Sequence, residues 1–367
     1  MKKKSSLEIS RKRAEAALDR TNTKIRELGG SSSRLYDTLS AIQDRFDEIR
    51  NVPEEQRLEY ESIRQIRLTW RQQAERIEKD YNIAQMKAAG KGAAGAGAGV
   101  AVVALGPTAA MGIATTFGVA STGTAISTLS GAAATNAALA WLGGGALAAG
   151  GGGMAAGNAL LALAGPIGWA IAGVALLGSG LLIFKSRSDK KRLERIFELI
   201  SERDTKSYEL AVVELEERIK RMDDEQAKLE AAIEKIASFG LDYSVMSEAQ
   251  QYELGAYVNL MNASTRLLVN PILGLQPKYT EDDLNAFIDS EAARIDAKSN
   301  KLVVHLCNLL YRIELDDRDR KLLRRTLRKN KELLAQLSLK RADVNDSVME
   351  TVKQALVRKY QSAGMVD

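Results

Sequence analysis

The sequence predicts an all-α protein in which long antiparallel coiled-coil arms flank a Gly/Ala-rich hydrophobic helical hairpin, with a small helical domain at the C-terminal end. Residues 92–184 contain no Asp, Glu, Lys or Arg, whereas the sequence on both sides is rich in all four. Those outer parts are dominated by Ala, Leu, Glu, Lys and Arg, and aromatic residues make up 5% of the chain, which is typical of helices rather than sheet. The predicted parts are residues 1–91, 92–184, 185–240 and 241–367.

The N-terminal arm keeps one heptad phase from residue 14 to residue 84. Position a holds Ala14, Thr21, Leu28, Leu35, Ile42, Ile49, Gln56, Ile63, Trp70, Ile77 and Ala84. Position d holds Leu18, Ile25, Ser32, Leu39, Phe46, Pro53, Tyr60, Arg67, Ala74 and Tyr81. A sustained a/d repeat of this kind predicts a coiled coil.

Two stretches in this arm have the composition of turns, Gly29–Ser33 and Asn51–Pro53. They predict breaks, with helices near 5–28, 33–50 and 54–88. The unbroken heptad phase favours the alternative of one longer element.

The second arm, residues 186–238, repeats apolar residues in the same way and is expected to return antiparallel beside the first. Its a series is Val212, Ile219, Gln226 and Ile233, and its d series is Leu215, Met222, Leu229 and Ile236. Gly240 is the expected C-terminal glycine. Further helices are predicted near 245–269, from Thr280 onward, and near 290–313, 317–338 and 342–361. Thr280, with Asp283 three residues later, is a predicted N-cap.

The uncharged centre has two stretches with the length and composition of a bilayer span. Residues 165–184 contain nine Leu, Ile, Phe or Val residues, which favours insertion by roughly 3–5 kcal/mol before Gly and Ser are counted. Residues 100–119 contain seven and include Pro107, while 124–153 are too poor in such residues to insert without neighbours. Lysines and arginines on both flanks predict an even number of passes: two, or alternatively four. A water-soluble hairpin packed against the arms is the remaining alternative.

Small residues recur along the faces of these predicted helices, at spacings that permit close helix packing in membranes. We expect them to pack between protomers and to make the protein a homo-oligomer. The predicted packing residues are Gly106, Ala110, Ala114, Gly118, Gly168, Ala172, Gly173 and Gly180.

The weakly hydrophobic stretches Ala96–Val119 and Asn158–Phe184, bounded by charged helices, resemble those of α-helical pore-forming proteins and of the apolipoprotein L type of channel-forming protein. Residues 123–145 are similar to glycine-zipper-like segments of bacterial membrane-associated proteins. The resemblance implies a membrane-inserting, oligomerising, pore-forming or membrane-disrupting effector, such as a bacterial toxin or an anti-phage suicide effector. The alternatives are a membrane-tethered coiled-coil scaffold without conductance and a phage-type structural or injected protein.

The N-terminus begins with Met1 and three lysines but has no apolar h-region behind them, so no secretion signal is predicted. One cysteine, Cys307, fits a reducing compartment. We therefore expect synthesis in the cytoplasm and association with the lipid bilayer of the inner membrane.

The C-terminal region has a basic amphipathic stretch around Leu322, Leu323 and Leu327. It is a candidate contact for anionic lipid head groups, for a phosphate-bearing ligand or for a regulatory partner, and its alternative is a solvated helix face. The candidate residues are Arg320, Lys321, Arg324, Arg325 and Arg328.

Enzymatic chemistry finds little support in the residues. His305 and Cys307 are the one histidine and the one cysteine, and residues two apart on a helix do not share a face. A zinc site or a Ser-His-Asp triad would therefore need unusual ligands. The Gly-rich run 95–99 follows a predicted helix rather than the strand that a phosphate loop needs. We expect no enzyme activity, cofactor or metal.

Overall fold

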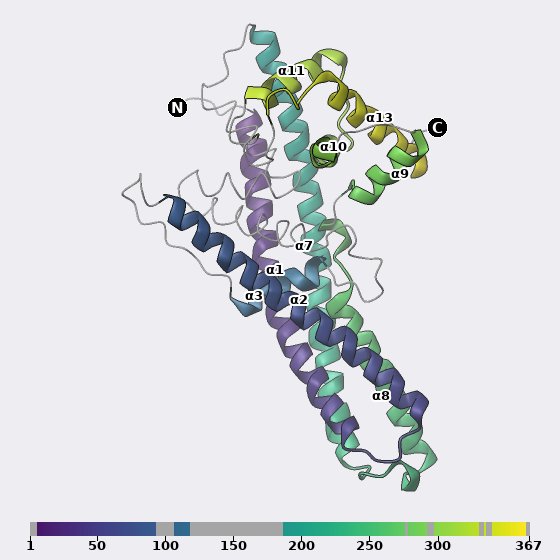
Figure 1. Cartoon of the computed structure of the whole chain (residues 1–367). Coiled ribbons are helices and arrows are strands. Elements are labelled where there is room, and N and C mark those ends of the chain that lie inside the picture. The colour runs from purple at the N-terminus through teal and green to yellow at the C-terminus, as the bar shows by residue number, and fades with distance from the viewer. Residues whose placement is uncertain are drawn as a thin grey trace, which may run out of the picture.

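The computed structural model describes residues 6–92, 106–117, 186–275, 278–291, 297–329, 334 and 340–364. These residues form an all-α fold, as predicted, and no strand occurs among them. Two helical hairpins form an elongated bundle. A group of short helices lies at the end of the molecule that is opposite to the two hairpin turns (Figure 1).

The first hairpin consists of α1 (Ser6–Asp47) and α2 (Glu54–Gly92), and the second of α7 (Arg187–Ala237) and α8 (Glu248–Val269). The predicted break at Asn51–Pro53 is confirmed, since Asn51 has φ 61° and α2 begins directly after Pro53. Gly240, with φ 84°, ends the second arm as predicted.

The two long arms run parallel rather than antiparallel. Arg20 of α1 lies 3.7 Å from Glu209 of α7, and farther along both helices Arg34 lies 2.9 Å from Asp223. The two hairpin turns also meet, where Arg50 N–H donates to the Leu241 carbonyl at 2.9 Å. The prediction of antiparallel arms was wrong because α2 returns the chain toward the end at which α1 began. The second arm therefore starts at that end.

The predicted break at Gly29–Ser33 is also wrong, because α1 continues through it as one helix of 42 residues. Glycine and serine weaken a helix by propensity alone, but tertiary packing overrides that weak preference here. Gly29 and Ser32 lie where another helix crosses α1, and the absence of a side chain at Gly29 and the small side chain of Ser32 make that crossing possible.

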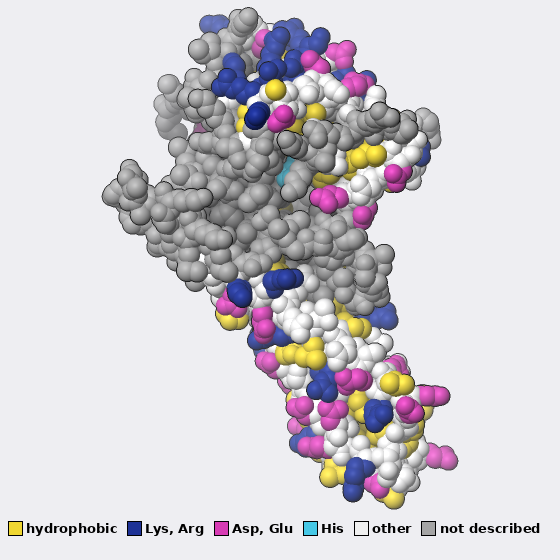
Figure 2. Space-filling model, viewed as in Figure 1, with side chains coloured by type: hydrophobic (Ala, Val, Ile, Leu, Met, Phe, Trp, Pro, Cys, Tyr) yellow, Lys and Arg dark blue, Asp and Glu magenta, His cyan; other side chains and the backbone are white. Residues whose placement is uncertain are grey.

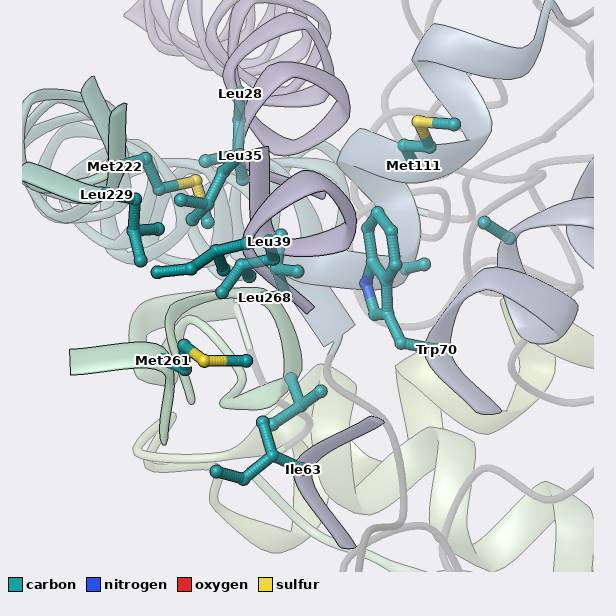
Figure 3. Packing of buried hydrophobic residues seen from close by; sticks show 14 of the residues in the cluster. Leu28, Leu35, Leu39, Ile63, Trp70, Met111, Met222, Leu229, Met261 and Leu268 are labelled. Atoms are coloured by element: carbon teal, nitrogen blue, oxygen red, sulfur yellow. The ribbon is translucent and has the colours of Figure 1, made fainter. Parts of the chain in front are cut away.

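The main core follows the predicted heptads. Leu28, Leu35 and Leu39 of α1 point toward Met222 and Leu229 of α7, while Met261 and Leu268 come from α8 (Figure 3). The described a and d residues of the N-terminal arm are buried except Gln56 at a, which is half-buried, and Pro53 at d, which is exposed. In α7 the d series is buried, whereas the a series is half-buried. The periodicity thus identified the buried side chains, although the coiled-coil geometry itself remains a prediction.

The C-terminal helices are α9 (Glu281–Glu291), α10 (Ala297–Leu310), α11 (Asp317–Lys329) and α13 (Asp346–Ser362). They enclose a second core that includes Leu193, Ile196, Phe197 and Ile200 from the first part of α7. The Thr280 cap is confirmed, since its hydroxyl accepts from Asp283 N–H at 3.1 Å and Asp283 accepts from Thr280 N–H at 2.9 Å. Helix α8 therefore packs with the long bundle, whereas the start of α7 packs with the C-terminal helices.

The prediction of a membrane protein with transmembrane helices is contradicted. Within the described ranges, every helix falls short of the length and apolar character that crossing a bilayer requires. The predicted span 100–119 contributes α3 (Pro107–Phe117), whose 11 residues compare with the roughly 20 that match a bilayer core. The predicted span 165–184 lies outside the described residues.

Candidate functional site

Helix α3 is the described part of the uncharged centre, and it is built into the long bundle. Pro107 occupies the first helical position, where its fixed φ favours a helix start and its missing N–H costs nothing. All side chains from Ala110 to Thr116 are buried. The helix packs against α1, α2 and α8. We call the surface that these three helices present to α3 the α3 seat.

The backbones of α1 and α3 approach each other closely in the seat where Gly29 of α1 faces Gly112 of α3. A β-carbon on Gly29 would stand 1.9 Å from the carbonyl oxygen of Thr108. A β-carbon on Gly112 would stand 2.0 Å from the carbonyl oxygen of Ile25. The backbones of the two helices are thus in direct contact at this crossing. Each position requires glycine because a side chain would not fit, and not because of its φ angle.

Polar contacts fix the register of α3 beside this crossing. Ser32 and Thr115 share a buried hydrogen bond, with 2.9 Å between their hydroxyl oxygens. At the far end of α3, Ile272 N–H donates to the Thr116 carbonyl at 2.8 Å. The Thr116 hydroxyl donates to the Gly112 carbonyl within the helix at 2.7 Å. These bonds satisfy polar groups that are out of contact with water.

Only some of the predicted packing residues lie in the α3 seat. Ala110 and Ala114 are fully buried, but their partners are helices of the same chain, and Gly106 is exposed. Gly118, Gly168, Ala172, Gly173 and Gly180 lie outside the described residues. Gly29 and Gly112 were not among the predicted packing residues, and Gly112 lies off the four-residue spacing of Gly106, Ala110 and Ala114 on which the prediction was based.

Helix α2, which forms one side of the seat, carries a buried cation. Arg67 is 3% exposed, and among the described residues its Nε and Nη1 have no hydrogen-bond partner. Burial lowers the pKa of its guanidinium. Its guanidinium lies 5.8 Å from the ring centre of Tyr36. Trp70, one turn along α2, stacks at a tilt on Tyr36 with 5.7 Å between ring centres, and Figure 3 shows it between α2 and α3.

The five basic residues of α11 that the sequence predicts as a contact surface fall into two groups in the structure. Arg320 pairs with Asp317 and donates to the Leu315 carbonyl, and Arg324 pairs with Asp346 at 2.8 Å. Lys321 and Arg325 are exposed, and Arg328 is half-buried. Two of the five predicted residues therefore stabilise the C-terminal fold, and the other three face outward.

Cys307 belongs to the second core, whereas His305 on the same helix is half-buried. Cys307 is fully buried, and burial raises the pKa of its thiol, which lies 3.9 Å from the Val352 carbonyl. Across the described part of the chain, no group of three or more His, Cys, Asp or Glu side chains has a metal-binding arrangement.

One buried carboxylate lies on α7 between Ile200 of the second core and Tyr208 of the main core. Asp204 of α7 accepts from Arg203 at 2.7 and 2.9 Å, and burial raises its pKa although Arg203 opposes the shift. Arg203 also donates to the carbonyls of Leu309 and Tyr311 at the end of α10. The pair thereby ties α7 to the C-terminal helices.

Comparison with known protein families, with curated proteins and with solved structures finds no match for this chain.

Proposed function

We propose that this protein is a non-enzymatic, self-associating helical scaffold whose long bundle controls its uncharged central segment through α3. With α3 in its seat, the central segment is attached to the bundle at the crossing with Gly29. With α3 released, the Gly/Ala-rich segment is free to associate with the same segment of other copies. The single observation that supports this proposal most is the glycine-to-glycine contact between α1 and α3.

The nature of that contact favours a reversible attachment. Among residues 107–116 only Met111 and Ile113 bury large apolar side chains, and the crossing itself is made by backbone and small residues. An 11-residue helix is also shorter than the roughly 12–15 residues that an isolated helix needs to be even marginally stable in water. The helical state of α3 therefore depends on the seat.

The composition of the central segment favours self-association once α3 is released. Residues 92–184 carry no charge, so in a free state little would oppose contact between two copies. Large uncharged surfaces with many apolar groups are usually covered by a partner. A lipid bilayer is not proposed as this partner, because no described helix is long and apolar enough to span one.

A disulfide across the seat tests this proposal. The 2.9 Å approach of the Ser32 and Thr115 hydroxyls makes Ser32→Cys/Thr115→Cys a suitable pair, and Cys307 can stay because its buried thiol is inert. We expect the reduced protein to form oligomers as concentration rises and the oxidised protein to stay monomeric, as measured by light scattering.

The matched control is Asn51→Cys/Asp242→Cys, which links the two hairpin turns, where Asn51 donates to Asp242 at 3.0 Å, and leaves α3 unlinked. Its oxidised form should oligomerise like the reduced protein. Equal oligomer distributions for the oxidised seat variant and this control would refute the proposal, as would a wild-type chain that is monomeric at every concentration.

A further inference from the structure

A strongly basic surface lies where the start of α7 meets α11. Residues 187–194 and 316–329 contain eleven Lys or Arg and five Asp or Glu, an excess of six, while the whole chain has a net charge of +5. Three ion pairs join the segments: Arg318 with Asp189 at 2.6 Å, Arg192 with Asp319 at 2.7 Å, and Arg192 with Asp316. Lys and Arg side chains gather at this end in Figure 2.

All the carboxylates of these two segments are already neutralised. Asp189 pairs with Arg318, Glu194 with Lys190, Asp317 with Arg320, and Arg192 serves both Asp316 and Asp319. Six cations have no ion pair with a described residue, and we call them the basic face. They are Arg187, Lys191, Lys321, Arg325, Arg328 and Lys329.

The fold holds this face rigidly outward. Leu322, Leu323 and Leu327 of α11 are buried in the second core, so the opposite side of the helix is exposed. Asp316 caps α11 by accepting from Asp319 N–H at 2.8 Å, and this bond together with Arg192 lowers the pKa of the Asp316 carboxyl. The cations are thus placed by a packed and capped helix rather than by a loop.

We propose that the basic face binds the phosphate backbone of double-stranded nucleic acid without reading its bases. Lys321 to Lys329 cover about 12 Å of helix axis at 1.5 Å per residue. Duplex DNA carries one charge per roughly 1.7 Å of axis, so several phosphates lie within that length. The sequence of α11 contains no aromatic side chain to stack on a base and no Asn or Gln to pair with adenine, and its Arg and Lys side chains, which can also bind guanine, are the usual partners of phosphates.

A lipid surface fits the same cations less well. Peripheral binding to a bilayer combines basic residues with apolar side chains that enter the interface. The apolar side of α11 is buried, and the large exposed apolar residues of the described chain belong to other elements. They are Ile9, Leu58, Leu210, Val213, Leu241, Val245, Tyr252, Leu273 and Val357.

Fluorescence anisotropy with a labelled 25-base-pair duplex of random sequence, titrated with the full chain at several KCl concentrations, tests this proposal. Six phosphate contacts predict a slope of about −5 in a plot of log K against log salt concentration. Lys321→Glu/Arg325→Glu should weaken binding at least tenfold. Lys321→Gln/Arg325→Gln, which adds no repulsion, should lower the size of the slope by about 2, one for each lost contact.

The matched control is Lys220→Glu/Lys235→Glu, which makes the same charge change on an exposed part of α7 far from α11. It should bind the duplex like wild type, and circular dichroism should show native helicity for all variants. The proposal is refuted if the duplex does not bind at 50 mM KCl or if the two Glu pairs weaken binding equally. It is also refuted if vesicles containing phosphatidylserine bind through Lys321 and Arg325 while the duplex does not.

Discussion

Gly29 of α1 and Gly112 of α3 meet so closely that neither position has room for a β-carbon. The nearest atoms to such a carbon belong to the backbone of the partner helix, at 1.9 Å for Gly29 and 2.0 Å for Gly112. A backbone cannot move aside as a flexible side chain can. The attachment of α3 therefore depends on these two residues having no side chain.

Gly29→Ala should destabilise the protein. The added methyl group forces α1 and α3 apart, and overpacking of this kind costs about 1–3 kcal/mol. Urea unfolding followed by circular dichroism measures the effect.

The neighbouring glycine provides an unusually close control. A β-carbon at Gly30 would meet only the Arg34 side chain, at 3.6 Å. Gly30→Ala should therefore raise the unfolding free energy by about 1 kcal/mol through helix propensity alone. We therefore expect Gly29→Ala to lower and Gly30→Ala to raise the free energy of unfolding. Equal effects of the two substitutions would contradict the close approach of α3 to Gly29.

The hydrogen bond between Ser32 and Thr115 should show strong coupling. Ser32→Ala or Thr115→Val alone leaves one buried hydroxyl without its partner, at a cost of about 1–3 kcal/mol. Replacing both removes the unsatisfied group, so the double variant should lose less than the sum of the single losses. Additive losses in a double-mutant cycle would show that the two side chains do not interact.

Arg67→Met should stabilise the protein, which is unusual for a buried residue. The guanidinium is buried and has no ion pair with a described residue, and its contact with Tyr36 and the charges of Asp44 and Asp47 offset only part of that cost. We expect the unfolding free energy to rise by about 1 kcal/mol. Arg64, which is 42% exposed and pairs with Glu61, is the control: Arg64→Met should change stability by less than about 0.5 kcal/mol.

Asp204 predicts a specific pH dependence. Burial raises its pKa above 3.8 in the folded chain, so the unfolded chain releases this proton first as pH rises. The contribution of Asp204 to stability therefore falls between pH 3.8 and the folded pKa. Unfolding free energies measured across this range should show that the advantage of wild type over Asp204→Asn shrinks as pH rises.

Asp242 should behave in the opposite way. Hydrogen bonds from Ser244 and Asn51 lower its pKa, so its stabilising contribution is present above pH 3.8 and is lost as pH falls through the folded pKa. The advantage of wild type over Asp242→Asn should grow as pH rises. The same direction for both variants would contradict the burial of Asp204.

Sequence periodicity was sufficient to identify much of the core. The heptad phase placed Arg67 at a d position among apolar residues, and Arg67 is buried there. Proline and glycine signals also located the turn at Asn51–Pro53 and the end of α7 at Gly240. These features depend on local geometry, which a single sequence contains.

The features that the sequence did not reveal depend on contacts between distant residues. Gly29–Ser33 has the composition of a turn, and only the approach of α3 explains why it is helical. The parallel direction of α1 and α7 follows from the return of the chain through α2. Arg320 and Arg324 looked equivalent to Lys321 and Arg325, but the position of Asp346 on α13 and of the Leu315 carbonyl separates them.

Native-state hydrogen exchange on the amides of α3 tests the central claim most directly, because the proposed function requires α3 to leave its seat while α1 and α7 stay folded. We predict that these amides are protected and that they exchange through an opening with a lower free energy than that of the α1 and α7 core. Exchange of α3 only by global unfolding, or no protection of α3 at all, would contradict the account.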